Sequence, residues 1–324
     1  MAKFIVTNER VIHHIPTALV SMPTAARNFL IVTADDFGLH ESINEAIEEA
    51  SHSGILTAAS LMISAPAARD AIARAHRTPA LRVGLHVVLA DGWSTLSHEL
   101  IPSLTDHDGF MGEDMVRRGF KIFASGSTRR QLEAEIRAQF EAYRRSGLGL
   151  DHVNVHKHFH VHPQVLTVLL SVARDYGVPA VRVPHEPLWF AQNHGSWLPP
   201  LSAALMVPLI ASMKRRLRAA GVLYNDWLFG MAASGAMDEE RVLSALSTLP
   251  PGVSEIYLHP AKIAQGGITA SMGNYRHGDE LAALLSKRVR LALDALDIGR
   301  GGYGDARIAG SIGRNKDLQN RSSP

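Results

Sequence analysis

Short apolar runs rich in β-branched residues alternate along the chain with longer segments whose apolar positions recur at helical spacing. The first pattern predicts buried strands of a parallel sheet, and the second predicts amphipathic helices packed on it. Strands are expected at 29–34, 55–63, 81–89, 152–156, 180–183 and 255–259. Helices are expected from Ile43 to Gly54, from Thr128, whose spacing to Gln131 is that of a capping box, to Gly147, and at 66–75, 163–176, 202–219, 238–249 and 279–293. About six or seven parallel strands favour a closed or nearly closed (β/α) barrel, with a doubly wound open sheet as the alternative.

The two ends of the chain differ from this repeating pattern. Residues 1–27 mix charged residues with short apolar stretches and make a poor signal peptide, so we expect an N-terminal extension. Residues 305–324 are polar and rich in Gly, Ser, Asn and Arg, which predicts a disordered tail. A single (β/α) domain is therefore expected over 28–304.

Composition narrows the chemistry. The 324 residues include no cysteine, which excludes disulfides, iron-sulfur clusters and thiolate ligands and leaves His, carboxylate or backbone oxygen for any metal. A net charge of +2 and the lack of a P-loop or dinucleotide-binding motif predict no nucleic-acid or nucleotide partner. No apolar run reaches the roughly 18 residues of a membrane span, so we expect no membrane-spanning helix. The absence of cysteine is compatible with the cytoplasm, where we expect the protein.

Polar residues gather where the predicted strands end. Asp35 and Asp36 follow a buried strand, His86 lies within another, and His156 and His259 each end one. Burying such groups unpaired is costly, so their recurrence at one end of a sheet predicts a shared site. His156 also lies within a run, residues 151–162, that holds five of the 17 histidines.

Two histidines and a carboxylate are a common ligand set of catalytic metal sites. Asp36, His86 and His156 fit that set, and they predict one divalent metal ion. Zinc is favoured by the ligand types, while magnesium stays an alternative. Adjacent side chains on an extended backbone point apart, so Asp35 is expected to be a general base beside the metal, with His259 as the acid. This arrangement predicts metal-assisted hydrolysis of an acyl or similar bond.

Simpler interpretations exist for each residue alone. The aspartate pair could cap a helix, His86 could be a hydrogen-bonded core histidine, and His259, which precedes Pro260, could be a loop residue. His158 and His160 are expected to line the pocket, whereas His152 and His162 are expected only to flank it.

Several motifs resemble the YdjC family of carbohydrate deacetylases. They are TADDFGL, INEAIEEA, GILTAASLM, VGLHVVL and DHVNVHKHFHVHP. The set VTADDFG, DHVNVHKHFH, VRVPHEP, NDWLFG and EIYLHPA more closely resembles the hopanoid-biosynthesis-associated HpnK group. The resemblance spans roughly residues 28 to 300.

The resemblance implies a divalent-metal N-deacetylase on a distorted TIM-type, (β/α) barrel-like fold. The family's metal ligands fall on Asp36, His86 and His156, its base on Asp35 and its acid on His259. The family often has Asp-Ser before the first motif histidine and His after it. This chain has Asn154-Val155 and Lys157 there, which leaves the ligand set intact.

The implied substrate is an N-acetylglucosaminyl hopanoid, with soluble chitooligosaccharides or other amino sugars as an alternative. The apolar stretch from Trp197 to Met213 and the basic run from Lys214 to Arg218 could form an element at the inner face of the membrane. An ordinary barrel helix is the competing interpretation. Expected sugar contacts, besides His158 and His160, are Arg182, Glu186, Trp189, Asp226 and Trp227.

Other functions stay open at this stage. A metal-dependent phosphoesterase could use the same ligands, and a sugar- or lipid-binding protein without catalysis could keep the same pocket. A glycosidase is disfavoured because consecutive aspartates point apart. The oligomeric state is not encoded in any motif.

Overall fold

The structure is a computed structural model that describes residues 28–195, 200–263 and 267–309. The expected N-terminal extension, most of the expected C-terminal tail and Trp197 lie outside the described residues. Within the described part, no helix combines the length and hydropathy that a membrane crossing needs.

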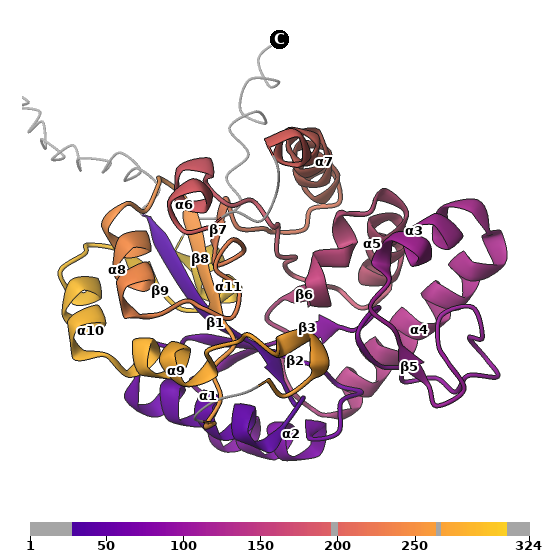
Figure 1. Cartoon of the computed structure of the whole chain (residues 1–324), viewed down its shortest axis with the longest axis horizontal. Coiled ribbons are helices and arrows are strands. Elements are labelled where there is room, and N and C mark those ends of the chain that lie inside the picture. The colour runs from indigo at the N-terminus through magenta and orange to yellow at the C-terminus, as the bar shows by residue number, and fades with distance from the viewer. Residues whose placement is uncertain (1–27, 196–199, 264–266, 310–324) are drawn as a thin grey trace, which may run out of the picture.

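A curled parallel sheet forms the centre of the molecule (Figure 1). Single parallel bridges from Val153 to Val181 and from Ala180 to Leu223 continue the pairing toward its other edge. The sheet therefore nearly closes, which confirms the barrel-like prediction over the open sheet. The strands in spatial order are β6 (Val153–Val155), β3 (Arg82–Val87), β2 (Ala58–Leu61), β1 (Phe29–Phe37), β8 (Val253–Leu258) and β7 (Trp227–Phe229), and β9 (Gly299–Arg300) pairs with the start of β1.

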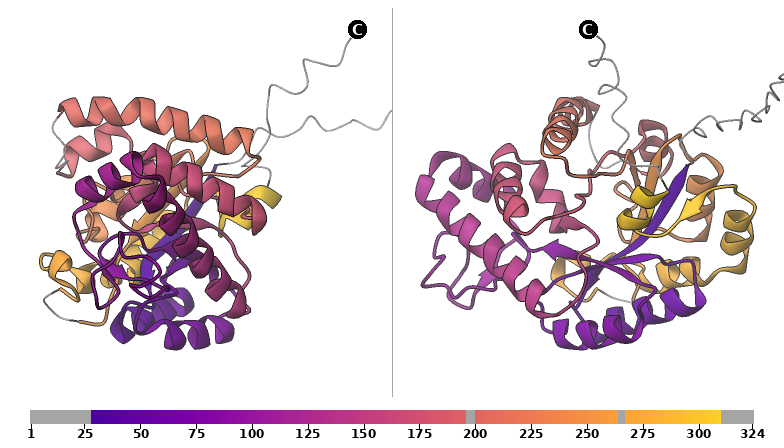
Figure 2. Two further views of the ribbon diagram at one scale, coloured as in Figure 1. Left: turned by 90° about the vertical axis from the view of Figure 1, so that its right-hand side faces the viewer. Right: turned by 180° about the vertical axis from the view of Figure 1, so that it is seen from behind.

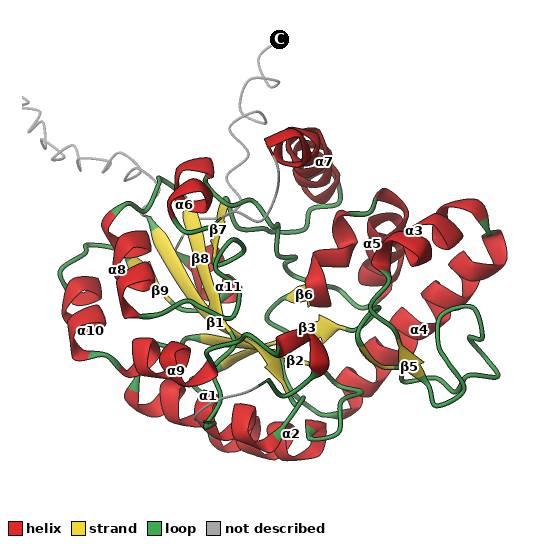
Figure 3. Cartoon of the chain, viewed as in Figure 1, coloured by secondary structure: helices red, strands yellow, loops and turns green. Residues whose placement is uncertain are grey.

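Helices pack on the outer side of this sheet (Figures 2 and 3). The described helices are α1 (Glu41–Ser53), α2 (Ala68–Arg77), α3 (Met115–Ala124), α4 (Gly126–Arg145), α5 (Pro163–Asp175), α6 (Leu188–Asn193), α7 (Pro200–Ala219), α8 (Glu239–Ser247), α9 (His277–Leu285), α10 (Lys287–Asp294) and α11 (Tyr303–Ile308). Two 3-10 turns, η1 (His156–Val161) and η2 (Ala270–Met272), and the hairpin β4 (Gly92–Trp93) and β5 (Phe110–Met111) complete the described elements.

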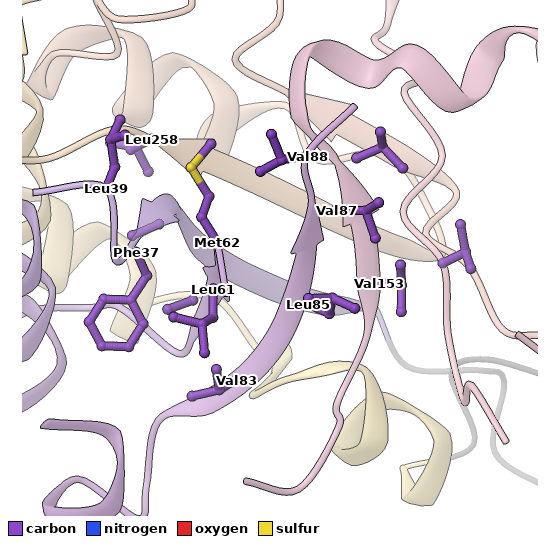
Figure 4. Packing of buried hydrophobic residues seen from close by; sticks show 14 of the residues in the cluster. Phe37, Leu39, Leu61, Met62, Val83, Leu85, Val87, Val88, Val153 and Leu258 are labelled. Atoms are coloured by element: carbon purple, nitrogen blue, oxygen red, sulfur yellow. The ribbon is translucent and has the colours of Figure 1, made fainter. Parts of the chain in front are cut away.

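The strands separate two environments because their side chains alternate between faces. Alternate residues such as Leu61, Leu85 and Val87 pack in the main apolar core (Figure 4). The alternate inner positions of β1 begin with Phe29 and Ile31 in a smaller cluster. Further along β1 the inward-facing residues are polar. The barrel interior near the carboxyl-terminal ends of the strands is therefore lined by side chains that require hydrogen-bond or ionic partners.

Three predicted elements differ in detail. Helix α4 begins after Ser125, whose hydroxyl accepts from the Thr128 amide, and Gln131 instead accepts from the Ser103 amide. The expected capping box is therefore wrong. The helix predicted at 279–293 is divided at Ser286, which caps α10. The strand expected at 180–183 pairs only through the two bridges.

Helix α11 closes the amino-terminal end of the barrel. Tyr303 and Ala306 are buried in the smaller apolar cluster with Phe29. Asp305 forms an ion pair with Arg82 at 2.9 Å. The expected domain boundary after residue 304 thus falls inside a packed helix, because polar composition concealed one buried face.

The basic run at the end of α7 contacts the protein itself. Lys214 donates to the Asp226 carbonyl at 2.8 Å and lies over the Trp227 ring. Arg216 donates to the Pro163 carbonyl at 3.0 Å. These contacts fit the ordinary barrel helix that the sequence left as the competing interpretation of this segment.

Candidate metal centre and active site

Asp36, His86 and His156 converge at the carboxyl-terminal end of the sheet. Asp36 Oδ1 lies 3.3 Å from His86 Nε2 and 3.3 Å from His156 Nδ1. The two imidazole nitrogens are 3.1 Å apart. All three side chains are buried, and their ligand atoms lie within 4.8 Å of one another.

An irregularity in β1 directs the two aspartates to different partners. The register with β2 shifts between Ala34 and Phe37, and Asp36 has a φ of 63°. A left-handed residue other than glycine costs about 1 kcal/mol, which the surrounding packing must supply. Gly38, with a φ of 96°, completes the turn against the Met62 carbonyl. As a result Asp35 points to Arg182, while Asp36 points to the histidines.

The three residues fit a divalent cation. Both Asp36 oxygens are buried, and neither accepts a hydrogen bond within the described residues. Burial alone would raise the pKa of Asp36, but His156 lowers it well below its usual value. Burial also opposes charge on His156, yet the Asp36 carboxylate raises the pKa of that imidazole to about 9. An unpaired buried carboxylate facing two imidazole nitrogens is an arrangement that a bound metal completes.

Asn154 supports the metal ligands and was missed by sequence reasoning. His86 Nδ1 donates to Asn154 Oδ1 at 2.7 Å, which leaves the Nε2 lone pair facing Asp36. The amide nitrogen of Asn154 donates to Asp35 Oδ1 at 3.1 Å and to Ser60 at 3.0 Å. The feature of the sequence that could have indicated Asn154 is its spacing, because it lies two residues before His156 and therefore on the same face of the strand.

Asp35 is held by a buried arginine. Arg182 donates to both Asp35 oxygens, at 2.5 and 2.9 Å, and to Glu255 at 2.7 Å. Burial would raise the pKa of Asp35, but the Arg182 charge lowers it below its usual range, so Asp35 is ionised. Arg182 is 0% exposed. The structure therefore places Arg182 inside the barrel, where it cannot reach a sugar.

His259 faces the centre from β8. Its Nε2 atom lies 4.0 Å from Asp36 Oδ2, and its backbone amide donates to Glu280 at 2.5 Å. Burial lowers the pKa of this histidine, and the two aspartates oppose that shift. Tyr275 packs beside the ring at 5.1 Å. His259 Nε2 therefore lies on the Oδ2 side of Asp36, whereas His86 and His156 face Oδ1.

The histidine run does not continue as a strand beyond His156. Lys157 and His158 have left-handed φ values of 54° each, so the chain turns into η1. Lys157 Nζ binds Asp91 at 2.7 Å, and Asp91 Oδ2 lies 3.9 Å from His156 Nε2. Ser271 donates to the same carboxylate at 2.5 Å. Lys157, which stands where the family often has a histidine, therefore holds the Asp91 carboxylate beside the imidazole of His156.

The expected histidine contacts have different surroundings. His158 is partly buried, and its Nε2 lies 3.3 Å from the hydroxyl of Tyr257, whose ring packs against His259. His160 is fully buried and donates to the Arg182 carbonyl at 2.8 Å. His160 is therefore part of the scaffold.

The other expected sugar contacts are not gathered at the centre. Glu186 accepts from three consecutive backbone amides, beginning at Gly230, so its oxygens are occupied. Trp189 packs against Phe229. Trp227 pairs with Ser254 near the start of β8, about 13 Å along the strand from its end. Its neighbour Asp226 accepts from Val253. Each of these residues thus has a contact within the fold, and its role as a sugar contact stays a prediction.

Comparison with known proteins places the chain among described relatives. A family model for YdjC-like protein matches residues 29–295. A carbohydrate deacetylase of Geobacillus stearothermophilus is 30% identical over 257 residues, which cover 79% of this chain and 89% of that one. A carbohydrate deacetylase of Brevibacillus brevis is 41% identical over 155 residues, covering 48% of this chain and 59% of that one.

A solved structure shares the fold. It is that of a candidate cellobiose-phosphate cleavage protein from Enterococcus faecalis, with a TM-score of 0.67 and 24% sequence identity. The match covers 86% of this chain and 98% of the other.

Proposed function

The chain belongs to the YdjC-like protein family, and from that membership we propose that it is a metal-dependent N-deacetylase acting on an N-acetylglucosamine-type sugar. The carrying observation is the convergence of Asp36, His86 and His156 between Asp35 and His259. The homologous carbohydrate deacetylases support the hydrolytic chemistry.

The residues divide the reaction between them. A divalent ion held by the three ligands would act as a Lewis acid toward the acetyl carbonyl and water. Asp35, ionised and held still by Arg182, accepts the proton that water loses on attack. The carbon–nitrogen bond then breaks, and His259 donates a proton to the departing amine. The products are acetate and a free amino sugar.

Ligand chemistry favours zinc for this site. Two imidazoles and one carboxylate suit zinc or another transition metal, whereas magnesium prefers oxygen ligands and retained waters. Elemental analysis of purified protein, repeated after chelation and reloading with zinc or magnesium, identifies the ion. An H86A variant that retains full metal stoichiometry would contradict the ligand assignment.

The proposed natural substrate is an N-acetylglucosaminyl group on a hopanoid lipid. The proposal rests on three motifs, at 181–187, 225–230 and 255–261, which together resemble those of the HpnK group. Soluble chitooligosaccharides are the alternative, and a sugar- or lipid-binding protein without turnover is a second one. Mass spectrometry of hopanoids from cells with and without the chain separates these, because loss of the enzyme should accumulate the N-acetylated form.

The direct test measures acetate released by metal-loaded protein from N-acetylated amino sugars. Asp35→Asn should reduce turnover at least about 100-fold, since general base catalysis contributes on that scale. Metal stoichiometry should stay unchanged, because Asp35 is not one of the three ligands. No acetate from wild-type protein with soluble sugars or glycolipid would sink the proposal. Phosphate release from phosphomonoesters would favour the phosphoesterase instead.

A further inference from the structure

Helix α3 presents an apolar side to solvent. Val116, Phe120 and Phe123 are 86%, 72% and 65% exposed. Their spacing places them on one side of the helix, while Gly119 and Ile122 are buried on another. Three large apolar side chains grouped on one exposed helix indicate an interaction surface.

Positive charge flanks this apolar side. The segment 115–130 contains five Lys or Arg residues and no Asp or Glu. Arg117 and Lys121 are exposed and each follows an apolar residue of the group by one position, about 100° around the helix. An apolar side with a cationic flank is the composition of a helix that lies in a membrane interface.

We propose that α3 docks this chain on an anionic lipid surface. Val116, Phe120 and Phe123 enter the boundary between headgroups and acyl chains, while Arg117 and Lys121 contact headgroup phosphates. The lipid contact itself does not depend on the proposed deacetylase function. Its advantage for a lipid-linked sugar does rest on that function.

The charge and size of the surface favour lipid over a second copy of the chain. A symmetric pair of α3 helices would bring Arg117 and Lys121 close to their own counterparts. A stable protein interface also buries about 800 Å² on each partner. Three side chains of one ten-residue helix fall well short of such an area.

The same helix touches the active-site segment from its buried side. A Cβ atom on Gly119 would lie 3.2 Å from His162, so α3 rests directly on the chain that follows metal ligand His156. A docked α3 therefore holds that segment within about one helix diameter of the lipid surface, roughly 10 Å.

The test is co-sedimentation of the full chain with phosphatidylcholine vesicles that contain or lack phosphatidylglycerol. Wild type should bind the anionic vesicles, and the double variant Phe120→Ser and Phe123→Ser should bind at least about tenfold more weakly. The double variant Arg117→Gln and Lys121→Gln should lose the preference for phosphatidylglycerol. Leu291→Ser, at a 71% exposed site on α10, is the matched control and should bind like wild type.

Several outcomes would overturn the proposal. One is wild type that does not sediment with anionic vesicles, and another is undiminished binding by the phenylalanine variant. Loss of binding in Leu188→Ser with Val207→Ser, exposed on α6 and α7, would place the contact there. A wild-type dimer that the phenylalanine variant converts to monomer, without vesicle binding, would assign α3 to a second copy.

The two proposals can fail separately. The phenylalanine variant should release acetate from soluble amino sugars at the wild-type rate, since neither residue belongs to the site. Vesicle binding without any acetate release by wild type would leave the docking surface standing and remove the deacetylase.

Discussion

Single side chains at this site serve two partners each. The carbonyl of Asn154 accepts from His86 and fixes which imidazole nitrogen faces the metal position. Its amide nitrogen simultaneously donates to Asp35, the proposed general base. Ligand orientation and base orientation are therefore coupled through one amide group.

Replacing Asn154 by Asp separates these two tasks. The new carboxylate can still accept from His86, so metal stoichiometry should be retained. It cannot donate to Asp35, and it places a second negative charge beside that residue, so turnover should fall about 10- to 100-fold. Asn154→Ala, which also loses the acceptor for His86, should reduce metal affinity as well. Wild-type turnover in Asn154→Asp would contradict the assigned hydrogen bond.

The convergence of the candidate site residues could be predicted where a buried side chain of that type is rare. Asp36 and His86 are costly in buried strands, so their mere presence near strand ends indicated a site. Asn154 was missed because an amide side chain in a strand carries no such mark. Arg182 was noticed, but it binds Asp35 inside the barrel. Trp227 misled for the opposite reason, since a conspicuous aromatic residue can lie at the wrong end of its strand.

At the scale of elements, alternation and helical spacing predicted most strands and helices. Apolar runs such as residues 29–34 are long enough to be unambiguous. Helix ends were less certain because they depend on particular hydrogen bonds, as Ser125 shows. The segment around Val181 was expected to be a full strand, but its ladder is limited to single bridges.

Glu280 of helix α9 makes the stability of the folded chain depend on pH. This buried carboxyl accepts from the backbone amides of Met237 and His259. Burial raises its pKa to about 7, with Arg276 opposing and Asp36 assisting that shift. The folded state therefore binds the proton more tightly than the unfolded chain does. Its contribution to stability is largest below the unfolded pKa and is lost as pH rises toward about 7.

Glu280→Gln should flatten this pH dependence. The wild-type midpoint of thermal unfolding should fall between about pH 4.5 and about pH 7, whereas the variant's should change less. The variant should also be less stable at low pH, because an amide cannot accept from both backbone groups in the same geometry. Asp279→Asn, on the exposed side of α9, is the control. Identical pH profiles for wild type and Glu280→Gln would contradict the raised pKa.

At the scale of the whole molecule, hydrogen bonds connect the two ends of the barrel. Tyr303 of α11 donates to Glu255 at 2.6 Å, and Glu255 accepts from Arg182 at 2.7 Å. Arg182 in turn holds Asp35, which accepts from Asn154. Helix α11 is thus connected through the barrel interior to the end of the fold that holds the candidate site.

Two changes test this connection. A chain ending at residue 302 removes α11, uncovers Phe29 and deletes the Arg82–Asp305 ion pair, so its thermal midpoint should fall by several degrees or more. A chain ending at residue 309 keeps all described contacts of α11 and is the control.

Tyr303→Phe keeps the packing but leaves Glu255 one donor short, which should cost about 1 to 3 kcal/mol of folding stability. Because Glu255 then relies more on Arg182, Asp35 is held less firmly, and the turnover number should drop more than KM rises. Unchanged turnover in Tyr303→Phe, together with lowered stability, would limit α11 to a purely structural part.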